Sequence, residues 1–228
     1  MGVTAGPATR VPIAILISGR GSNMVSLVQA ARDRRLSADV RVVASNRADA
    51  PGLRVAESLG VPVAVVDHRG YPTREAFDAA LGDELARRGV EFVALAGFMR
   101  VLTPVFLRRW PGRVLNIHPA LLPAFPGVHA QRQALEYGVR VSGCTVHFVD
   151  EGVDTGPIVA QAVVPVLDSD TEQTLADRIL AMEHLLYPLA LEAVLTGRAR
   201  VSGRRVLGVD HLVFSGITPW PGRPPVEA

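Results

Sequence analysis

Asn116, His118 and Asp154 are the residues of this chain whose types and spacing are best suited to chemistry. The run from Arg113 to His118 alternates polar and apolar residues as a β-strand does, and strand residues two apart point to the same face. Asn116 and His118 are therefore expected side by side at the end of a strand that Pro119 stops. With a carboxylate on a glycine-flanked loop, this set can polarise a carbonyl, hold an oxyanion and manage a nucleophile's proton. The alternative is a structural Asn and His at a strand end.

A glycine-rich segment, residues 19–23 (Gly-Arg-Gly-Ser-Asn), lies between an expected strand and an expected helix. Glycines permit close backbone approach, and the free N–H groups and dipole of a helix start attract an anion. The segment departs from the dinucleotide fingerprint, because Met24 replaces the third glycine and the second strand ends in Asn46 rather than an acid. It therefore favours a single phosphate over NAD, with a plain turn as the alternative.

Other candidates are weaker when each is judged by itself. Arg74, at the start of an expected helix, is either a second contact to the same anion or a solvated surface arginine. Glu183, in the last expected helix, faces either the cleft or solvent. The turn at residues 95–100 offers Met99 as a surface for a flat heterocyclic ligand, or is a simple turn between core elements. His118, His129 and His147 could form a metal site with Asp154, but they lack metal-ligand spacing, so we expect no metal.

The composition indicates a globular protein with a sizeable core. Of 228 residues, 48% are hydrophobic and 20% charged, and the net charge is +2 without a basic block, so we expect no nucleic-acid partner. The sequence has no signal-like leader and no apolar stretch of membrane-spanning length, so we expect a cytoplasmic protein with no membrane partner. Cys144 is the single cysteine, which excludes an internal disulfide.

Strand and helix patterns alternate along the first half of the chain, which predicts an α/β fold with a doubly wound, mostly parallel, Rossmann-like sheet. The strands are expected at 11–18, 40–45, 61–66, 90–96 and 114–117, and the helices after 23, after 51, at 73–88 and near 104–109. Ligands bind beyond the C-terminal ends of such strands, where the glycine loop, the 97–100 turn, Asn116 and His118 all fall.

The second half predicts an antiparallel C-terminal portion. Runs at 140–149 and 157–166 have no helix between them and are expected to pair as a hairpin. Asp170 to Gln173 has a capping-box pattern that opens a helix reaching about residue 196, and short strands follow at 199–207. We expect a disordered leader at 1–10, one domain at 11–215 and a Pro-rich tail at 216–228.

These segments together resemble the phosphoribosylglycinamide formyltransferases of the formyl-folate transferase superfamily. The resemblance runs from about Val11 to Pro188 and is carried by five segments. They are residues 17–23, 95–100, 115–123, 143–149 and 154–157. The resemblance implies transfer of a formyl group from 10-formyltetrahydrofolate, as cosubstrate, to the amine of glycinamide ribonucleotide (GAR) in purine biosynthesis.

The same resemblance implies roles for individual residues, with Asn116, His118 and Asp154 catalytic. The GAR phosphate and ribose site is implied at Gly21, Ser22, Asn23, Arg74 and Glu183, and the folate site at Met99, Arg100, Val101, Leu102, Asp150 and Asp154. Two departures, Ala120 and Gln131, stand where the family often has serine and histidine, and each puts a secondary hydrogen bond in doubt.

Three other functions remain open from the sequence. A formyltetrahydrofolate deformylase would use the same three residues with water as the nucleophile, but that family carries an extra N-terminal domain. A methionyl-tRNA formyltransferase would add a basic C-terminal domain. A non-catalytic nucleotide-phosphate binding module would explain the glycine loop and leave Asn116, His118 and Asp154 without a purpose. The sequence permits either a monomer or a homodimer.

Overall fold

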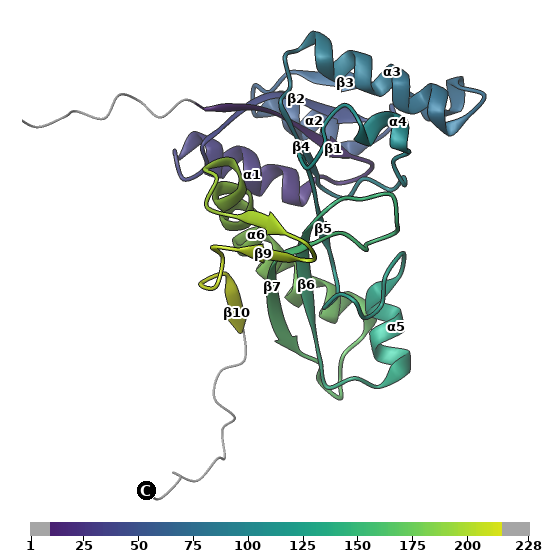
Figure 1. The fold of residues 1–228 in the computed structure, drawn as a ribbon. Helices are drawn as coiled ribbons and strands as arrows, with labels where there is room; N and C mark the ends of the chain where they lie inside the picture. Colours follow the sequence, from purple (N-terminus) through teal and green to yellow (C-terminus); the bar gives the residue numbers. More distant parts are fainter. Residues whose placement is uncertain (1–9, 216–228) are drawn as a thin grey trace, which may run out of the picture.

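The parallel half of the sheet is the part nearest the N-terminus (Figure 1). A computed structural model describes residues 10–215; the expected leader before Arg10 and the expected tail 216–228 lie outside that range. The strands are β1 (Val11–Ile17), β2 (Ala38–Ser45), β3 (Val63–Val65), β4 (Phe92–Leu95) and β5 (Val114–His118). They pair in parallel in the order β3-β2-β1-β4-β5. The predicted Rossmann-like half is therefore confirmed.

The antiparallel portion begins at β5. The further strands are β6 (Val141–Phe148), β7 (Ile158–Pro165), β8 (Arg200–Ser202), β9 (Arg205–Leu207) and β10 (Val213–Ser215). β5 with β6 and β6 with β7 pair antiparallel, which confirms the expected hairpin. β8 and β9 are also antiparallel, whereas β9 and β10 each pair in parallel with β7. The sheet thus changes direction at the strand that carries Asn116 and His118.

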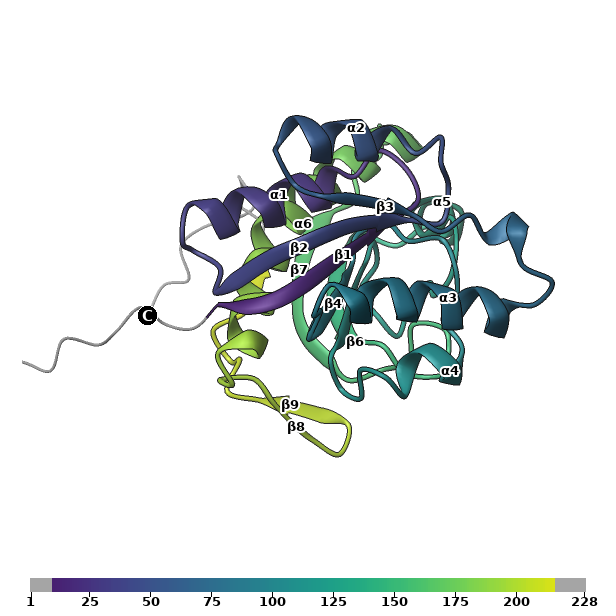
Figure 2. The same cartoon turned by 90° about the horizontal axis from the view of Figure 1, so that it is seen from above.

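Helices cover both faces of the sheet (Figure 2). They are α1 (Ser22–Arg32), α2 (Pro51–Ser58), α3 (Arg74–Arg87), α4 (Pro104–Leu107), α5 (Ala130–Tyr137) and α6 (Glu172–Leu195), with a short 3₁₀ turn at His68–Gly70. One core joins α1, α2 and α6 to the sheet, for example through Leu27, Leu53 and Ile179. A second core lies under α3 and α4 and contains Phe77 and Phe106. Two cores on opposite faces confirm the doubly wound arrangement.

Two local details differ from the sequence expectation. The helix α5 was not expected, because it is only eight residues long and mostly polar. Only Ala130 and Ala134 of this helix are buried. The capping box of α6 is formed by Thr171 and Thr174 rather than by Asp170 and Gln173. Asp170 instead accepts hydrogen bonds from an arginine on α6 and from a backbone N–H, so the pattern marked the helix start one residue early.

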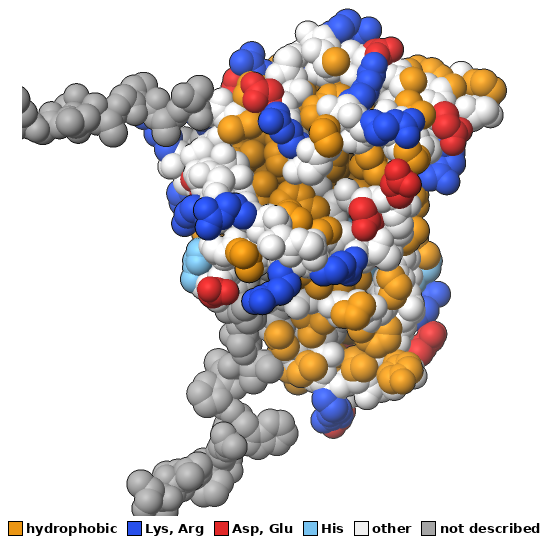
Figure 3. All heavy atoms as spheres, in the orientation of Figure 1, with side chains coloured by type: hydrophobic (Ala, Val, Ile, Leu, Met, Phe, Trp, Pro, Cys, Tyr) orange, Lys and Arg blue, Asp and Glu red, His pale blue; other side chains and the backbone are white. Residues whose placement is uncertain are grey.

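α6 and the α3–α4 layer differ in how much of the sheet they cover. α6 contacts β5, β6 and β7, and its buried Tyr187 hydroxyl lies 3.0 Å from the carbonyl oxygen of Leu95 and 3.1 Å from that of Leu115. On the opposite face, the second core ends near β4 and β5. Beyond the second core, loops rather than helices lie against β5 and β6. On the molecular face shown in Figure 3, basic and acidic side chains are interspersed.

Candidate active site

Asn116 and His118 lie on the same face of β5, as the alternation predicted. The apolar residues that alternate with them, Leu115 and Ile117, belong to the core under α6. The polar pair therefore faces the other way, towards the loops, and both side chains line a cleft of about 570 Å³. His118 is 4% exposed, and β5 ends at this residue before Pro119.

Asp154 joins these two residues from the loop between β6 and β7. Its backbone has a φ of 54°, a left-handed conformation that non-glycine residues rarely adopt. One carboxylate oxygen, Oδ2, accepts the N–H of Gly127 at 2.8 Å and lies 3.3 Å from Nδ1 of His118. The structure therefore brings the predicted amide, imidazole and acid together. Their catalytic roles stay predictions.

His118 has an acceptor beside each of its ring nitrogens. Nε2 donates to the carbonyl oxygen of Phe125 at 2.8 Å, because a carbonyl can only accept, and Nδ1 faces Asp154. Burial lowers the pKa of His118 below its ordinary value, while Asp154 and the Phe125 carbonyl oppose that shift. For Asp154, burial acts to raise the pKa, but the His147 ring, the Gly127 N–H and His118 together lower it. The two acceptors therefore favour a ring protonated on both nitrogens, whereas burial favours the neutral ring.

His147 is a fourth member of the site that the sequence reasoning did not place there. It lies on β6 directly across from Asn116, and its Nε2 is 3.2 Å from the amide nitrogen of Asn116. The same nitrogen is 3.5 Å from Oδ1 of Asp154. The sequence did carry one signal, because Cys144-Thr-Val-His147 alternates apolar and polar residues as β5 does. The register between the two strands, however, cannot be read from either segment.

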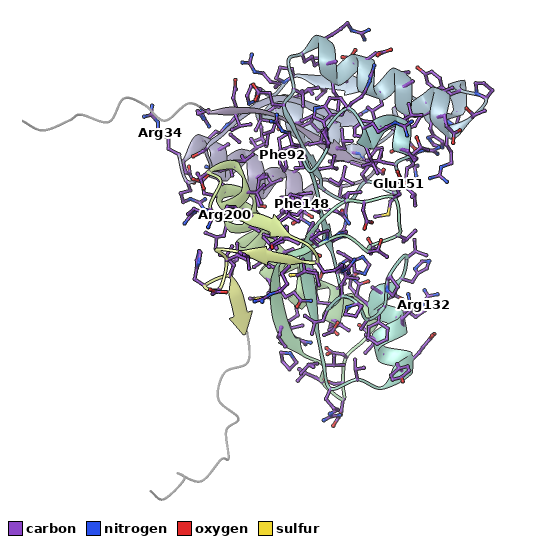
Figure 4. All side chains as sticks on the ribbon, viewed as in Figure 1. Arg34, Phe92, Arg132, Phe148, Glu151 and Arg200 are labelled. Atoms are coloured by element: carbon purple, nitrogen blue, oxygen red, sulfur yellow. The ribbon has the colours of Figure 1, made fainter. Side chains whose placement is uncertain are left out.

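The expected folate residues form one wall of the same cleft. The cleft is lined by Met99, Arg100, Val101, Leu102, Asp150 and Asp154, together with residues 127–129, Gln131 and Glu172 that were not predicted. Met99 is 71% exposed, so a large apolar side chain is left open to a ligand. Figure 4 places Glu151, from the loop that carries Asp150 and Asp154, on the same side of the molecule as Arg132 of α5.

Buried polar groups hold the 99–103 segment in place. The N–H of Met99 donates to the hydroxyl of Ser18 at 2.8 Å, and that hydroxyl donates to Asn46 at 2.6 Å. At the other end, the N–H of Thr103 donates to a carboxylate oxygen of Asp78 at 2.5 Å. Burial raises the pKa of Asp78, and the Thr103 hydrogen bonds oppose the shift. The segment is therefore a fixed wall rather than a free loop.

The glycine loop leads into α1, and Gly21 is the residue just before the helix; its φ of 75° suits glycine. No side chain caps the start of this helix. Asn23 in the first turn donates to Oε2 of Glu183 at 2.6 Å, so two of the predicted GAR residues meet across α1 and α6. Burial raises the pKa of Glu183, with the Asn23 hydrogen bond opposing it. Ser22 lies at the same helix start. An uncapped helix start beside a buried carboxylate suits a ligand with both an anion and a hydroxyl or amine.

Arg74 is the predicted residue that the structure does not place at the glycine loop. Its guanidinium donates to the carbonyl oxygen of Val101 at 2.5 Å, on the wall of the folate cleft. Its contact with a phosphate stays a prediction.

The chain is similar to known proteins along most of its length. The model of the family described as "Formyl transferase" matches residues 11–191, and the chain belongs to that family. The phosphoribosylglycinamide formyltransferase of Mycobacterium tuberculosis is 45% identical over 206 residues, which are 88% of this chain and 95% of that protein. A solved structure, glycinamide ribonucleotide transformylase 1 from Symbiobacterium toebii, is 51% identical, with a TM-score of 0.87, over 90% of this chain and 96% of that one. These findings confirm the resemblance read from the sequence.

Larger relatives share the same region. The "Trifunctional purine biosynthetic protein adenosine-3" of Drosophila pseudoobscura pseudoobscura is 50% identical over 193 residues, which are 84% of this chain. This chain spans only 14% of that protein's length. Among residues 10–215, no cluster of three or more His, Cys, Asp or Glu side chains is arranged to hold a metal ion. Over the same part of the chain, no helix is long and apolar enough to cross a bilayer.

Proposed function

We propose that this chain transfers the formyl group of 10-formyltetrahydrofolate to the amine of GAR, a step of purine biosynthesis. The observation that carries the proposal is the meeting of Asn116, His118 and Asp154 inside the cleft that Met99 to Leu102 line. The uncapped start of α1 and Glu183 supply the second substrate's site. Both substrates are small molecules, and no metal takes part in the proposed reaction.

The reaction begins when the neutral amine of GAR attacks the formyl carbon. A C–N bond forms while the C=O π electrons move to the oxygen, which becomes an oxyanion. Asn116 donates an N–H to that oxygen, and the positive charge of His118, once it is protonated, helps to stabilise the oxyanion. Asp154 holds the imidazole and receives the amine proton through water. The intermediate then collapses, the bond to the folate nitrogen breaks, and that nitrogen takes up a proton.

No covalent enzyme intermediate is required. In this proposal the two substrates lie next to each other, and proximity supplies a large part of the rate. Removing one oxyanion donor typically lowers kcat by about 10²–10³. We therefore expect Asn116→Ala to lower kcat by about that factor with a smaller change in KM.

The decisive experiment mixes the protein with 10-formyltetrahydrofolate in the presence and absence of GAR. Folate turnover that requires GAR is the expected result. Turnover without GAR would identify a hydrolase, which would use the same three residues with water as nucleophile. If Asn116→Ala, His118→Ala and Asp154→Asn all kept the wild-type kcat, these three residues would not be the catalytic site.

A further inference from the structure

His147 and Asn116 form a cross-strand pair within the antiparallel β5–β6 ladder. The two residues are direct register partners, and such partners on one face have side chains in contact. His147 is 2% exposed, and its ring lies between β6, Asn116 and Asp154. An imidazole buried to this degree finds most of its hydrogen-bond partners within the protein.

One hydrogen bond fixes which ring nitrogen carries the proton. Nδ1 of His147 lies 2.8 Å from the carbonyl oxygen of Phe148, and a carbonyl only accepts, so Nδ1 bears the hydrogen. In the neutral ring, Nε2 then has only a lone pair. The group facing that lone pair at 3.2 Å must be a donor, which is the amide nitrogen of Asn116.

With Nε2 of His147 unprotonated, the amide of Asn116 has one allowed orientation. Its nitrogen carries two hydrogens, so one is used by His147 and the second remains for a ligand in the cleft. The flipped amide would present its carbonyl oxygen instead, and an oxygen would repel an oxyanion rather than stabilise it. The asparagine by itself does not decide between these two orientations.

We propose that His147 is a positioning residue that holds the Asn116 amide with its N–H towards the cleft. The proposal rests on the proposed role of Asn116 as an oxyanion donor. A competing arrangement puts a proton on Nε2 and pairs it with Oδ1 of Asp154, 3.5 Å away, which is the contact by which His147 would lower the pKa of Asp154. In that arrangement the Asn116 amide would be flipped, with its oxygen towards His147 and not its nitrogen. The two arrangements therefore exclude each other.

The protonation state of His147 is measurable without any assay of activity. Long-range ¹⁵N–¹H NMR of the wild-type protein, with His147 assigned by comparison with His147→Gln, separates a protonated from an unprotonated ring nitrogen. We expect Nδ1 protonated and Nε2 unprotonated at neutral pH. A protonated Nε2 would overturn the proposal, even in a protein that formylates GAR efficiently.

Kinetics test the coupling to Asn116. His147→Phe removes the lone pair and should lower kcat by roughly ten- to a hundredfold, with KM for the folate changed less than about threefold. His147→Gln keeps an acceptor oxygen and should recover part of the loss. In an Asn116→Ala background, His147→Phe should cost less than about twofold, because the group it positions is already gone.

His184 provides a matched control. It is an imidazole on α6 whose Nε2 is buried without a hydrogen-bond partner among the described residues. His184→Phe should leave kcat within about twofold of wild type. Equal losses from His147→Phe in the wild-type and Asn116→Ala backgrounds would refute the coupling. If the wild-type protein lacks GAR-dependent turnover, the proposed function fails, and the NMR result still decides the orientation.

Discussion

Gly156 lies where the loop that carries Asp154 returns to β7, and it is pressed against the end of β6. A Cβ at this position would lie 1.8 Å from the carbonyl oxygen of Phe148 and 2.7 Å from its carbonyl carbon. Both atoms belong to the backbone, so no rotamer change can relieve the clash. The same carbonyl accepts the hydrogen bond from Nδ1 of His147. Gly156→Ala should therefore disturb the catalytic loop and the His147 ring at once.

The size of the effect follows from these distances. Ordinary contact begins near 3.4 Å, so the 1.8 Å gap must open by about 1.6 Å through backbone movement. The ladder bond from the N–H of Phe148 to the Pro157 carbonyl, 2.9 Å long, resists that movement. A misplacement of about 1 Å costs about 10² in rate, and overpacking costs about 1–3 kcal/mol of stability. We expect kcat to fall about a hundredfold and unfolding to need about 2 kcal/mol less.

Steady-state kinetics and urea unfolding would measure both effects. Gly152→Ala is the matched control on the same loop, since its Cβ would meet the hydroxyl of Thr155, a side chain that can rotate away. It should cost less than about tenfold in kcat. If Gly156→Ala kept wild-type kcat and stability, the loop would be free to move by more than an ångström without consequence. The reasoning that ties the Asp154–His118 geometry to the rate would then be wrong.

Three further predictions follow from buried polar contacts. Ser18→Ala leaves the N–H of Met99 without a hydrogen-bond acceptor, so KM for the folate should rise severalfold while kcat changes less. An unchanged KM would show that this contact does not shape the cleft. Asp154→Asn removes the charge that raises the pKa of His118, so this pKa should be lower in the variant than in wild type when it is measured by NMR titration. A higher value would contradict the ion-pair geometry. The hydrogen bonds from an α6 arginine lower the pKa of Asp170, so its stabilising effect is present above the unfolded-state pKa and is lost on acidification. Urea unfolding between about pH 6 and about pH 3 should therefore show a smaller acid loss in Asp170→Asn than in wild type, and equal losses would refute this.

The parallel half of the fold was predictable because its signals are local. Each buried strand is an apolar run, and each helix repeats apolar residues at its own period, so β1 and α1 fall where the sequence placed them. The strand at 61–66 is shorter than expected, with only Val63–Val65 paired, because it is the edge strand of the sheet. α5 had no such signal, since its contacts with α6 rather than its own pattern stabilise it.

The site was predictable where sequence spacing fixes geometry and not where register does. Asn116 and His118 are two residues apart on one strand, so their common face followed from the pleat. The position of His147 depends on how β6 aligns with β5, which only the folded sheet determines. Arg74 shows the same limit, because its partner Val101 comes from a separate segment. The division of the chain into a leader, one domain and a tail stays a prediction.

The two faces of the β5–β6 pair explain why the site forms here. Leu115, Ile117, Cys144 and Val146 point into the core under α6, and Asn116, His118, Thr145 and His147 alternate with them. Alternation puts these four polar residues on the opposite face, beyond the reach of the second core. A helix packed there would bury polar groups without partners, at a cost of about 1–3 kcal/mol each. A loop and a ligand satisfy them instead, so the strand pattern that excludes a helix from this face is the pattern that creates the cleft.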